Sequence, residues 1–233
     1  MMKIIFHLYN VKYLLGILMI FGLLSTVAAH ADASESQFNA KEGFLITISR
    51  FESAILKLNN RLTHKQATRL ATLIAIESKK NGLDPRIVLA ILNTESSFNQ
   101  KAVSSTGDLS IAQMNPKVWT PKMFQSRTGQ TIEWSRVKKD EAYAISRMVL
   151  ILSWLKNSFS KHDKWWFARY HSATPEFKNI YIVKLTKNFK ILKPFGRNLL
   201  RDMPTVKSIA QIPNLETKDL KLAELGINKY EAN

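Results

Sequence analysis

The sequence contains no cysteine, and glycine and proline are scarce, with 8 and 7 among 233 residues. Without cysteine the chain has no disulfide, no thiolate metal site and no lipid-modified cysteine behind a leader, which excludes a lipoprotein. The shortage of turn-forming residues disfavours a loop-rich all-β fold. An α-rich protein whose stability rests on its hydrophobic core is therefore expected, with apolar residues making up 45% of the chain.

A long membrane-spanning run is also missing. The apolar stretch from Leu14 to Leu24 is short for a transmembrane helix. Lys3 and Lys12 precede or flank it, and Ala29-His30-Ala31 has the A-x-A form of a cleavage site. We interpret residues 1–31 as a secretory signal peptide and expect a periplasmic protein. An uncleaved membrane anchor is the alternative.

Acidic residues are few: 18 stand against 34 lysines and arginines, which gives a formal charge of +16. Two of the basic residues lie in the predicted leader, so the exported chain keeps +14. Such a charge favours a polyanionic partner. Because export argues against nucleic acid, the bacterial wall or an anionic membrane surface is the expected polyanion, and a merely solubilising basic surface stays open.

Helical periodicity runs through most of the remaining chain. Thr63 and Gln66 have the spacing of a capping box and predict a helix through about Lys80. Asp84-Pro85 predicts the start of the next helix. Further helices are predicted over 42–58, 116–124, 140–159, 165–170 and 174–188, and 104–113 is predicted as an irregular segment with short strands. The expected fold is mainly α, a single domain with a small irregular or β segment beside the cleft.

Glu95 is the most informative residue of this pattern. It follows Ile91 by four residues and Leu92 by three, so it continues the apolar face of its helix at the C-terminal end. A carboxylate on an apolar face is costly unless it is paired or functional. Burial penalises the charged form and keeps a carboxylic acid protonated near neutral pH, as proton delivery to a poor leaving group requires. Taken alone, a solvated or salt-bridged glutamate at a helix end is the more common case.

Several short motifs follow Glu95 in a fixed order: Glu95-Ser96-Ser97-Phe98-Asn99, Ala102-Val103-Ser104, Gly107-Asp108, Gln113-Met114-Asn115-Pro116 and Tyr170-His171-Ser172-Ala173. This order and the ungapped spacing from Glu95 to Gln113 resemble the soluble lytic transglycosylases with a lysozyme-like domain, over roughly residues 66–190. Gly107-Asp108 resembles the small members tied to secretion and conjugation machines. The departures from the family pattern are Gln100, Ser110, Ala112 and His171-Ser172.

The resemblance implies cleavage of the bond between N-acetylmuramic acid and N-acetylglucosamine, with Glu95 as the single acid and base and a 1,6-anhydro product. It also implies that Tyr170 hydrogen-bonds Glu95, and that Ser104, Gln113 and Asn115 line the substrate cleft. No cofactor is implied, and the five histidines show no metal-ligand spacing. The expected partners are peptidoglycan strands and an envelope-spanning secretion or conjugation machine, for a monomeric enzyme.

Two other functions stay open. A hydrolytic muramidase needs a second carboxylate to activate water, and Asp108 is the nearest candidate, although we favour a turn role for it. A catalytically weak wall-binding assembly factor is motivated by Ser110 and His171. Core packing is the expected role of Trp165-Trp166, and a place in the cleft wall that of His171. The predicted organisation is a leader (1–31), a helical extension (32–65), the transglycosylase domain (66–190) and a tail (191–233).

Overall fold

The computed structural model describes residues 35–196 and 199–210, and within these the chain is mainly α, as predicted. The predicted signal peptide lies outside the described residues. In chain order, a helix over 35–58 is followed by α2 (His64–Lys80), α3 (Pro85–Ser96), α4 (Pro121–Thr128), α5 (Trp134–Lys139), α6 (Glu141–Phe159), η1 (Trp166–Tyr170), α7 (Pro175–Leu192), η2 (Lys193–Phe195) and α8 (Val206–Ala210). No described helix has both the length and the apolar character needed to cross a membrane.

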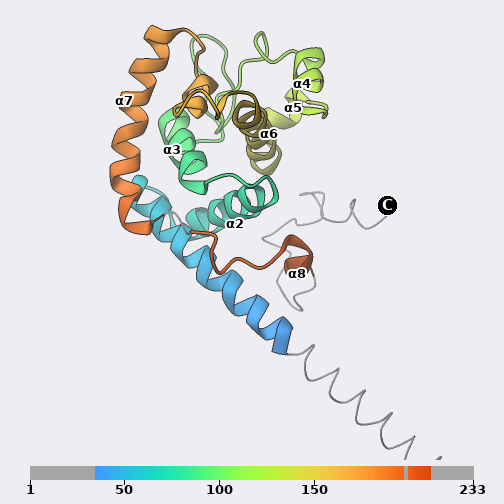
Figure 1. The fold of residues 1–233 in the computed structure, drawn as a ribbon, viewed down its shortest axis with the longest axis vertical. Coiled ribbons are helices and arrows are strands. Elements are labelled where there is room, and N and C mark those ends of the chain that lie inside the picture. Colours follow the sequence, from blue (N-terminus) through green and yellow to red (C-terminus); the bar gives the residue numbers. More distant parts are fainter. Residues whose placement is uncertain (1–34, 197–198, 211–233) are drawn as a thin grey trace, which may run out of the picture.

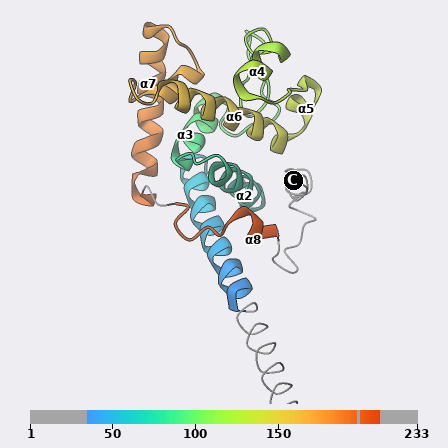
Figure 2. The ribbon, with the colours of Figure 1, turned by 45° about the vertical axis from the view of Figure 1, so that its right-hand side comes forward.

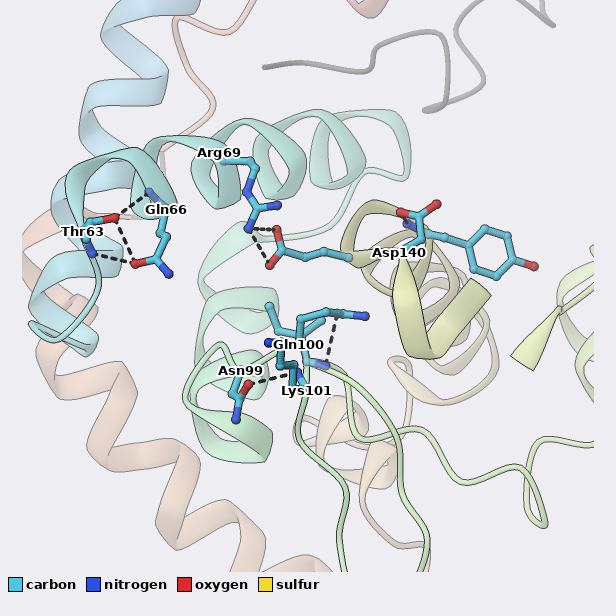
Figure 3. Close-up of polar contacts among 10 residues, drawn as sticks. Thr63, Gln66, Arg69, Asn99, Gln100, Lys101 and Asp140 are labelled. Atoms are coloured by element: carbon cyan, nitrogen blue, oxygen red, sulfur yellow. Dashed lines mark hydrogen bonds and ion pairs between the residues drawn. The ribbon is translucent and has the colours of Figure 1, made fainter. Parts of the chain in front are cut away.

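The helix predicted over 42–58 extends over 35–58, whereas the predicted starts of α2 and α3 are confirmed. Thr63 and Gln66 form the reciprocal capping box at the start of α2, with both hydrogen bonds present (Figure 3). At the start of α3, the carboxylate of Asp84 accepts a hydrogen bond from the backbone N–H of Arg86, and Pro85 occupies the first helical position. These caps satisfy backbone groups that a helix end leaves without partners.

The prediction for the middle of the chain is only partly right. The helix predicted over 116–124 is α4, which begins at Pro121 because the Thr120 hydroxyl caps it through Met123. The short α5 was not predicted, since Trp134–Lys139 is rich in lysine and arginine and too brief to show a period. Over the irregular segment the only pairing within the described residues consists of two isolated antiparallel bridges, from Leu109 to Val103 and to Met114.

Helix α6 lies at the centre of the domain (Figure 1), and it packs against α2, α4, α5 and η1. Nine of its residues are buried, as expected from apolar residues around most of its circumference. Helix α3 lies between α2 and α7, so α7 forms an outer side of the molecule in both views (Figures 1 and 2). One face of α3 therefore meets the core and another meets α7.

The two ends of the described chain join this same core. Phe44, Ile48, Phe51 and Ile55 of the helix over 35–58 are buried, and so are Leu199, Met203 and Ile209. The segment 199–210 belongs to the predicted tail (191–233). It runs back beside this helix and α2, and Arg50 forms an ion pair with Asp202 there. The approach is close at Gly43, where an added Cβ would lie 2.3 Å from the carbonyl oxygen of Asp202.

Candidate active site

Glu95 lies in the last turn of α3, where the helix leaves the core. The buried residues Ile91 and Leu92 precede it, and Ser97 ends the helix in the left-handed conformation (φ 52°). Ser96 fixes the turn that follows, because its hydroxyl donates to the carbonyl of Ile111 at 2.7 Å. Glu95 is itself partly buried. The predicted continuation of the apolar face thus brings its carboxyl group to the edge of the core.

The hydrogen-bond partner of Glu95 is a buried tyrosine on α7. The hydroxyl of Tyr181 donates to Oε1 of Glu95 at 2.5 Å. Burial raises the pKa of Glu95 to about 7, and the hydrogen bond from Tyr181 opposes this rise. The negative charge of Asp108 raises the pKa further, while Lys184 lowers it. Glu95 can therefore carry a proton near neutral pH and also lose it there, as a general acid and base must.

Tyr170 does not have the predicted contact with Glu95. Its hydroxyl donates to the carbonyl of Ala112 at 2.7 Å, so it ties η1 to the loop after α3. The prediction followed the position of Tyr170 in the motif, whereas the contact depends on how α7 docks. Tyr181 lies four residues before Leu185 and seven before Asn188, all of which are buried. That spacing on the inner side of a helix was the signal in the sequence that could have identified Tyr181.

An asparagine holds α7 against α3. The side-chain amide of buried Asn188 donates to the carbonyl of Ala90 at 3.1 Å and to the hydroxyl of Thr94 at 2.7 Å. Its side-chain oxygen accepts from Asn93 at 2.9 Å. Since an unpaired buried amide is costly, this set of bonds specifies one register between the two helices. That register fixes where Tyr181 meets Glu95.

Ser104 and Asn115 come together around Asp108 in the loop after α3. One carboxylate oxygen of Asp108 accepts hydroxyl hydrogen bonds from Ser104 and Thr106, each at 2.6 Å. The other accepts from the Asn115 amide at 2.8 Å. Partial burial by itself raises the pKa of Asp108, but these three hydrogen bonds and nearby His171 outweigh it and hold the pKa below its usual value. Asp108 is a fixed anion whose charge reaches Glu95.

Gln113 also binds within this loop. Its side-chain amide donates to the carbonyls of Ser110 at 2.8 Å and Ala102 at 3.1 Å. Gln113 and Ser110 both adopt left-handed backbone conformations, with φ of 47° and 70°. The predicted substrate residues Ser104, Gln113 and Asn115 thus share one loop, and the contacts described for them connect parts of that loop to one another.

His171 lies flat on the ring of Tyr181, with ring centroids 4.6 Å apart and planes 9° apart. Loss of water around the imidazole lowers its pKa, as does the charge of Lys184, while Asp108 acts in the opposite sense. The neighbouring aromatic pair packs as predicted: Trp166 is buried, Trp165 is partly buried, and both form T-shaped ring pairs with Phe167. Among the described residues, no group of three or more acidic, histidine or cysteine side chains could hold a metal ion.

Comparison with known proteins gives one match. Residues 72–172 match the family model described as the Transglycosylase SLT domain. No curated protein and no solved structure matched the chain. The matched segment runs from α2 through the loop around Asp108 to the residue after His171, and it includes Glu95, Ser104, Gln113, Asn115 and Tyr170. The helical fold agrees with a lysozyme-like domain of this kind, and the match of residues 72–172 supports membership of the soluble lytic transglycosylase family.

Proposed function

We propose that the protein cleaves peptidoglycan glycan strands as a lytic transglycosylase with Glu95 as its single general acid and base. A transglycosylase SLT domain implies this class of activity on peptidoglycan. The finer assignment rests on one observation, the partly buried Glu95 carboxyl group that accepts a hydrogen bond from Tyr181 and has a pKa of about 7. That value lets the same group deliver and then recover a proton near neutral pH.

The proposed reaction has two proton transfers. Protonated Glu95 donates to the oxygen that links N-acetylmuramic acid to N-acetylglucosamine, and the bond to that oxygen breaks. The N-acetyl oxygen of the substrate stabilises the resulting positive charge, so the protein need not supply a nucleophile. Glu95, now a carboxylate, removes the proton from the C6 hydroxyl, and that oxygen closes the 1,6-anhydro ring. Glu95 ends the cycle protonated, and no water is consumed.

In this proposal Tyr181 orients the carboxyl group and Tyr170 supports the loop through Ala112. Ser104, Gln113 and Asn115 keep the loop in the shape that receives the N-acetyl and hydroxyl groups of the sugar. Asp108 favours protonated Glu95 by its negative charge and also stabilises positive charge on the sugar ring. No cofactor enters the scheme.

The main alternative is a hydrolytic muramidase, and the observation that supports it is the ionised carboxylate of Asp108. An ionised carboxylate whose charge reaches Glu95 is the kind of second group that hydrolysis with a water nucleophile requires. Mass spectrometry of digested sacculi separates the two reactions, because anhydro products are one water lighter than hydrolysed ones. Recovery of reducing ends alone would reject the transglycosylase mechanism.

The second alternative is a wall-binding assembly factor with little activity. Wild type and Glu95→Gln are incubated with purified sacculi, and both released muropeptides and bound protein are measured. We expect release by wild type only, since Glu95→Gln has no proton to deliver, and similar binding by both. If both proteins bind and neither releases product, the enzyme proposal fails and the assembly role stands.

We also propose the place where the protein acts. Residues 1–31 would direct export to the periplasm, and 66–190 would form the catalytic domain between an N-terminal extension and a C-terminal tail. The exposed side of α7 carries Phe177, Ile180 and Val183 among lysines, a surface suited to a partner such as an envelope-spanning secretion or conjugation machine. A fusion of residues 1–31 to a reporter that is active only after export tests the location.

A further inference from the structure

We infer that His171 is a positioning residue, whose imidazole covers the ring of Tyr181 and thereby holds the hydroxyl that orients Glu95. This inference rests on the proposed function and adds a residue to it. Within the motif Tyr170-His171-Ser172-Ala173, His171 stands where the family pattern has asparagine, so the stack is a property of this chain. An imidazole ring offers an aromatic face to the phenol ring and covers more of it than the smaller amide group of an asparagine would.

The backbone around His171 is anchored on both sides. Tyr170, directly before it, is tied to the loop through the carbonyl of Ala112 at 2.7 Å. The backbone N–H of His171 donates to the carbonyl of Ala168 at the end of η1. Helix η1 itself packs against both α6 and α7. The imidazole is therefore placed by the same elements that bring α7 to α3.

The stack limits how Tyr181 can move. Its ring is buried and lies 4.6 Å from the imidazole in a nearly parallel plane, so the imidazole blocks a tilt of the ring toward it, which is the kind of movement that would displace the hydroxyl. The opposite end of Tyr181 donates to Glu95 at 2.5 Å. Holding the ring thus holds the donor in line with the carboxyl group, and the imidazole also keeps water from that side of the phenol. Precise placement of an acid is worth much of its catalytic effect.

The charged groups that face His171 come from two other elements. Lys184 on α7 and Asp108 in the loop after α3 both influence the imidazole, with opposite effects on its pKa. Water loss and Lys184 favour the neutral ring. A neutral imidazole stacked by its face is poorly placed to act as a second acid, which leaves positioning as the role that its geometry supports.

The test compares wild type with His171→Ala, His171→Phe and Glu95→Gln, and uses His162→Ala as a control at an exposed histidine nine residues earlier in the chain. Release of muropeptides from sacculi is measured from pH 4 to 9. We expect His171→Ala to lower kcat by about tenfold with little change in KM, the size expected for loss of one ring pair. His171→Phe restores most of that loss because it restores a ring.

A second readout does not depend on turnover. The pKa of Glu95 is measured in each folded variant by NMR of the carboxyl carbon. Because burial is the largest cause of the raised pKa, admitting water beside Tyr181 in His171→Ala should move it down toward the ordinary glutamate value. The descending limb of the pH–rate profile should shift to lower pH by the same amount.

The outcomes separate the two claims. An inactive wild type overturns the proposed function. An active wild type with inactive Glu95→Gln, combined with an unchanged rate and Glu95 pKa in His171→Ala, overturns only the role of His171. Equal impairment of His171→Phe and His171→Ala also overturns it, since the imidazole nitrogens and not the ring face would then matter. Near-ultraviolet circular dichroism shows whether each variant keeps its packing.

Discussion

The hydroxyl of Tyr181 lies 2.5 Å from Oε1 of Glu95, although 86 residues separate the two in the chain. The contact joins the end of α3 to the inner side of α7. It lowers the pKa of Glu95 somewhat, yet burial dominates and the value stays near 7. The bond therefore orients the acid without abolishing its ability to carry a proton at neutral pH.

Replacing Tyr181 with phenylalanine removes this donor and keeps the ring. We expect kcat for glycan cleavage to fall about 10- to 100-fold, the range for a hydrogen bond to a charged group. Because the lost bond lowers the pKa of Glu95, that pKa should rise and the descending limb of the pH–rate profile should move to higher pH. Tyr170→Phe is the matched control, and the descending limb of its pH–rate profile should not shift. A larger shift in Tyr170→Phe would contradict the assignment.

Glu95→Gln should change stability in a pH-dependent manner. The folded pKa of about 7 exceeds the ordinary value of 4.5, so the folded state holds its proton more strongly than the unfolded state. Wild type therefore loses stability as pH rises from about 4.5 to 7 and no further beyond. Glutamine avoids this loss, and the variant should be more stable than wild type by about 1–3 kcal/mol at pH 8.

Thermal unfolding of both proteins at pH 4 and pH 8 checks this expectation. The two melting temperatures should nearly coincide at pH 4, where the wild-type carboxyl group is protonated in both states. Glu42→Gln, at an exposed glutamate on the helix over 35–58, serves as the control. If Glu95→Gln is less stable than wild type at pH 8, the ionised carboxylate of Glu95 is not destabilised by burial and the expectation is wrong.

Much of the fold could be predicted from short sequence patterns. The capping box at Thr63 and the proline after Asp84 are complete within four residues, so the starts of α2 and α3 were predictable. Helix α5 was missed because six residues, half of them basic, carry no usable period. The place of Glu95 at the end of a buried face followed from helix geometry alone.

The hydrogen-bond partner of Glu95 could not be predicted in the same way. Four tyrosines follow Glu95 in the chain, and only the docking of α7 on α3 decides that Tyr181, and not Tyr170, reaches the carboxyl group. That docking depends on Asn188, whose bonds to Ala90 and Thr94 span more than 90 residues. A single sequence does not show directly which residues make contact when they lie so far apart in the chain.

Asp108→Asn separates the two possible chemistries. The charge of Asp108 raises the pKa of Glu95, so its removal should shift the descending limb of the pH–rate profile to lower pH. A transglycosylase keeps part of its activity and still forms only anhydro ends. A hydrolase that uses Asp108 to activate water would no longer form hydrolysed product. Ser105→Ala, at an exposed position of the same turn, is the control.

Gly43→Ala tests the docking of the C-terminal segment. In an ordinary helix this change stabilises by about 0.5–1 kcal/mol. Here the added Cβ would lie 2.3 Å from the carbonyl of Asp202, so the segment over 199–210 must move. We expect a net loss of about 1–3 kcal/mol, as for other overpacked sites, and faster proteolysis of this segment. Ser49→Ala, exposed on the same helix, should be neutral or stabilising.

Four non-glycine residues beside Glu95 adopt left-handed backbone angles: Ser97, Phe98, Ser110 and Gln113. Each such residue costs about 1–2 kcal/mol, which the rest of the fold must offset. Ser110 does so where the family has glycine, the residue that takes this conformation freely. In the proposed function, the shape of the loop that receives the sugar is therefore fixed when the chain folds, and no turnover has to supply the free energy for it.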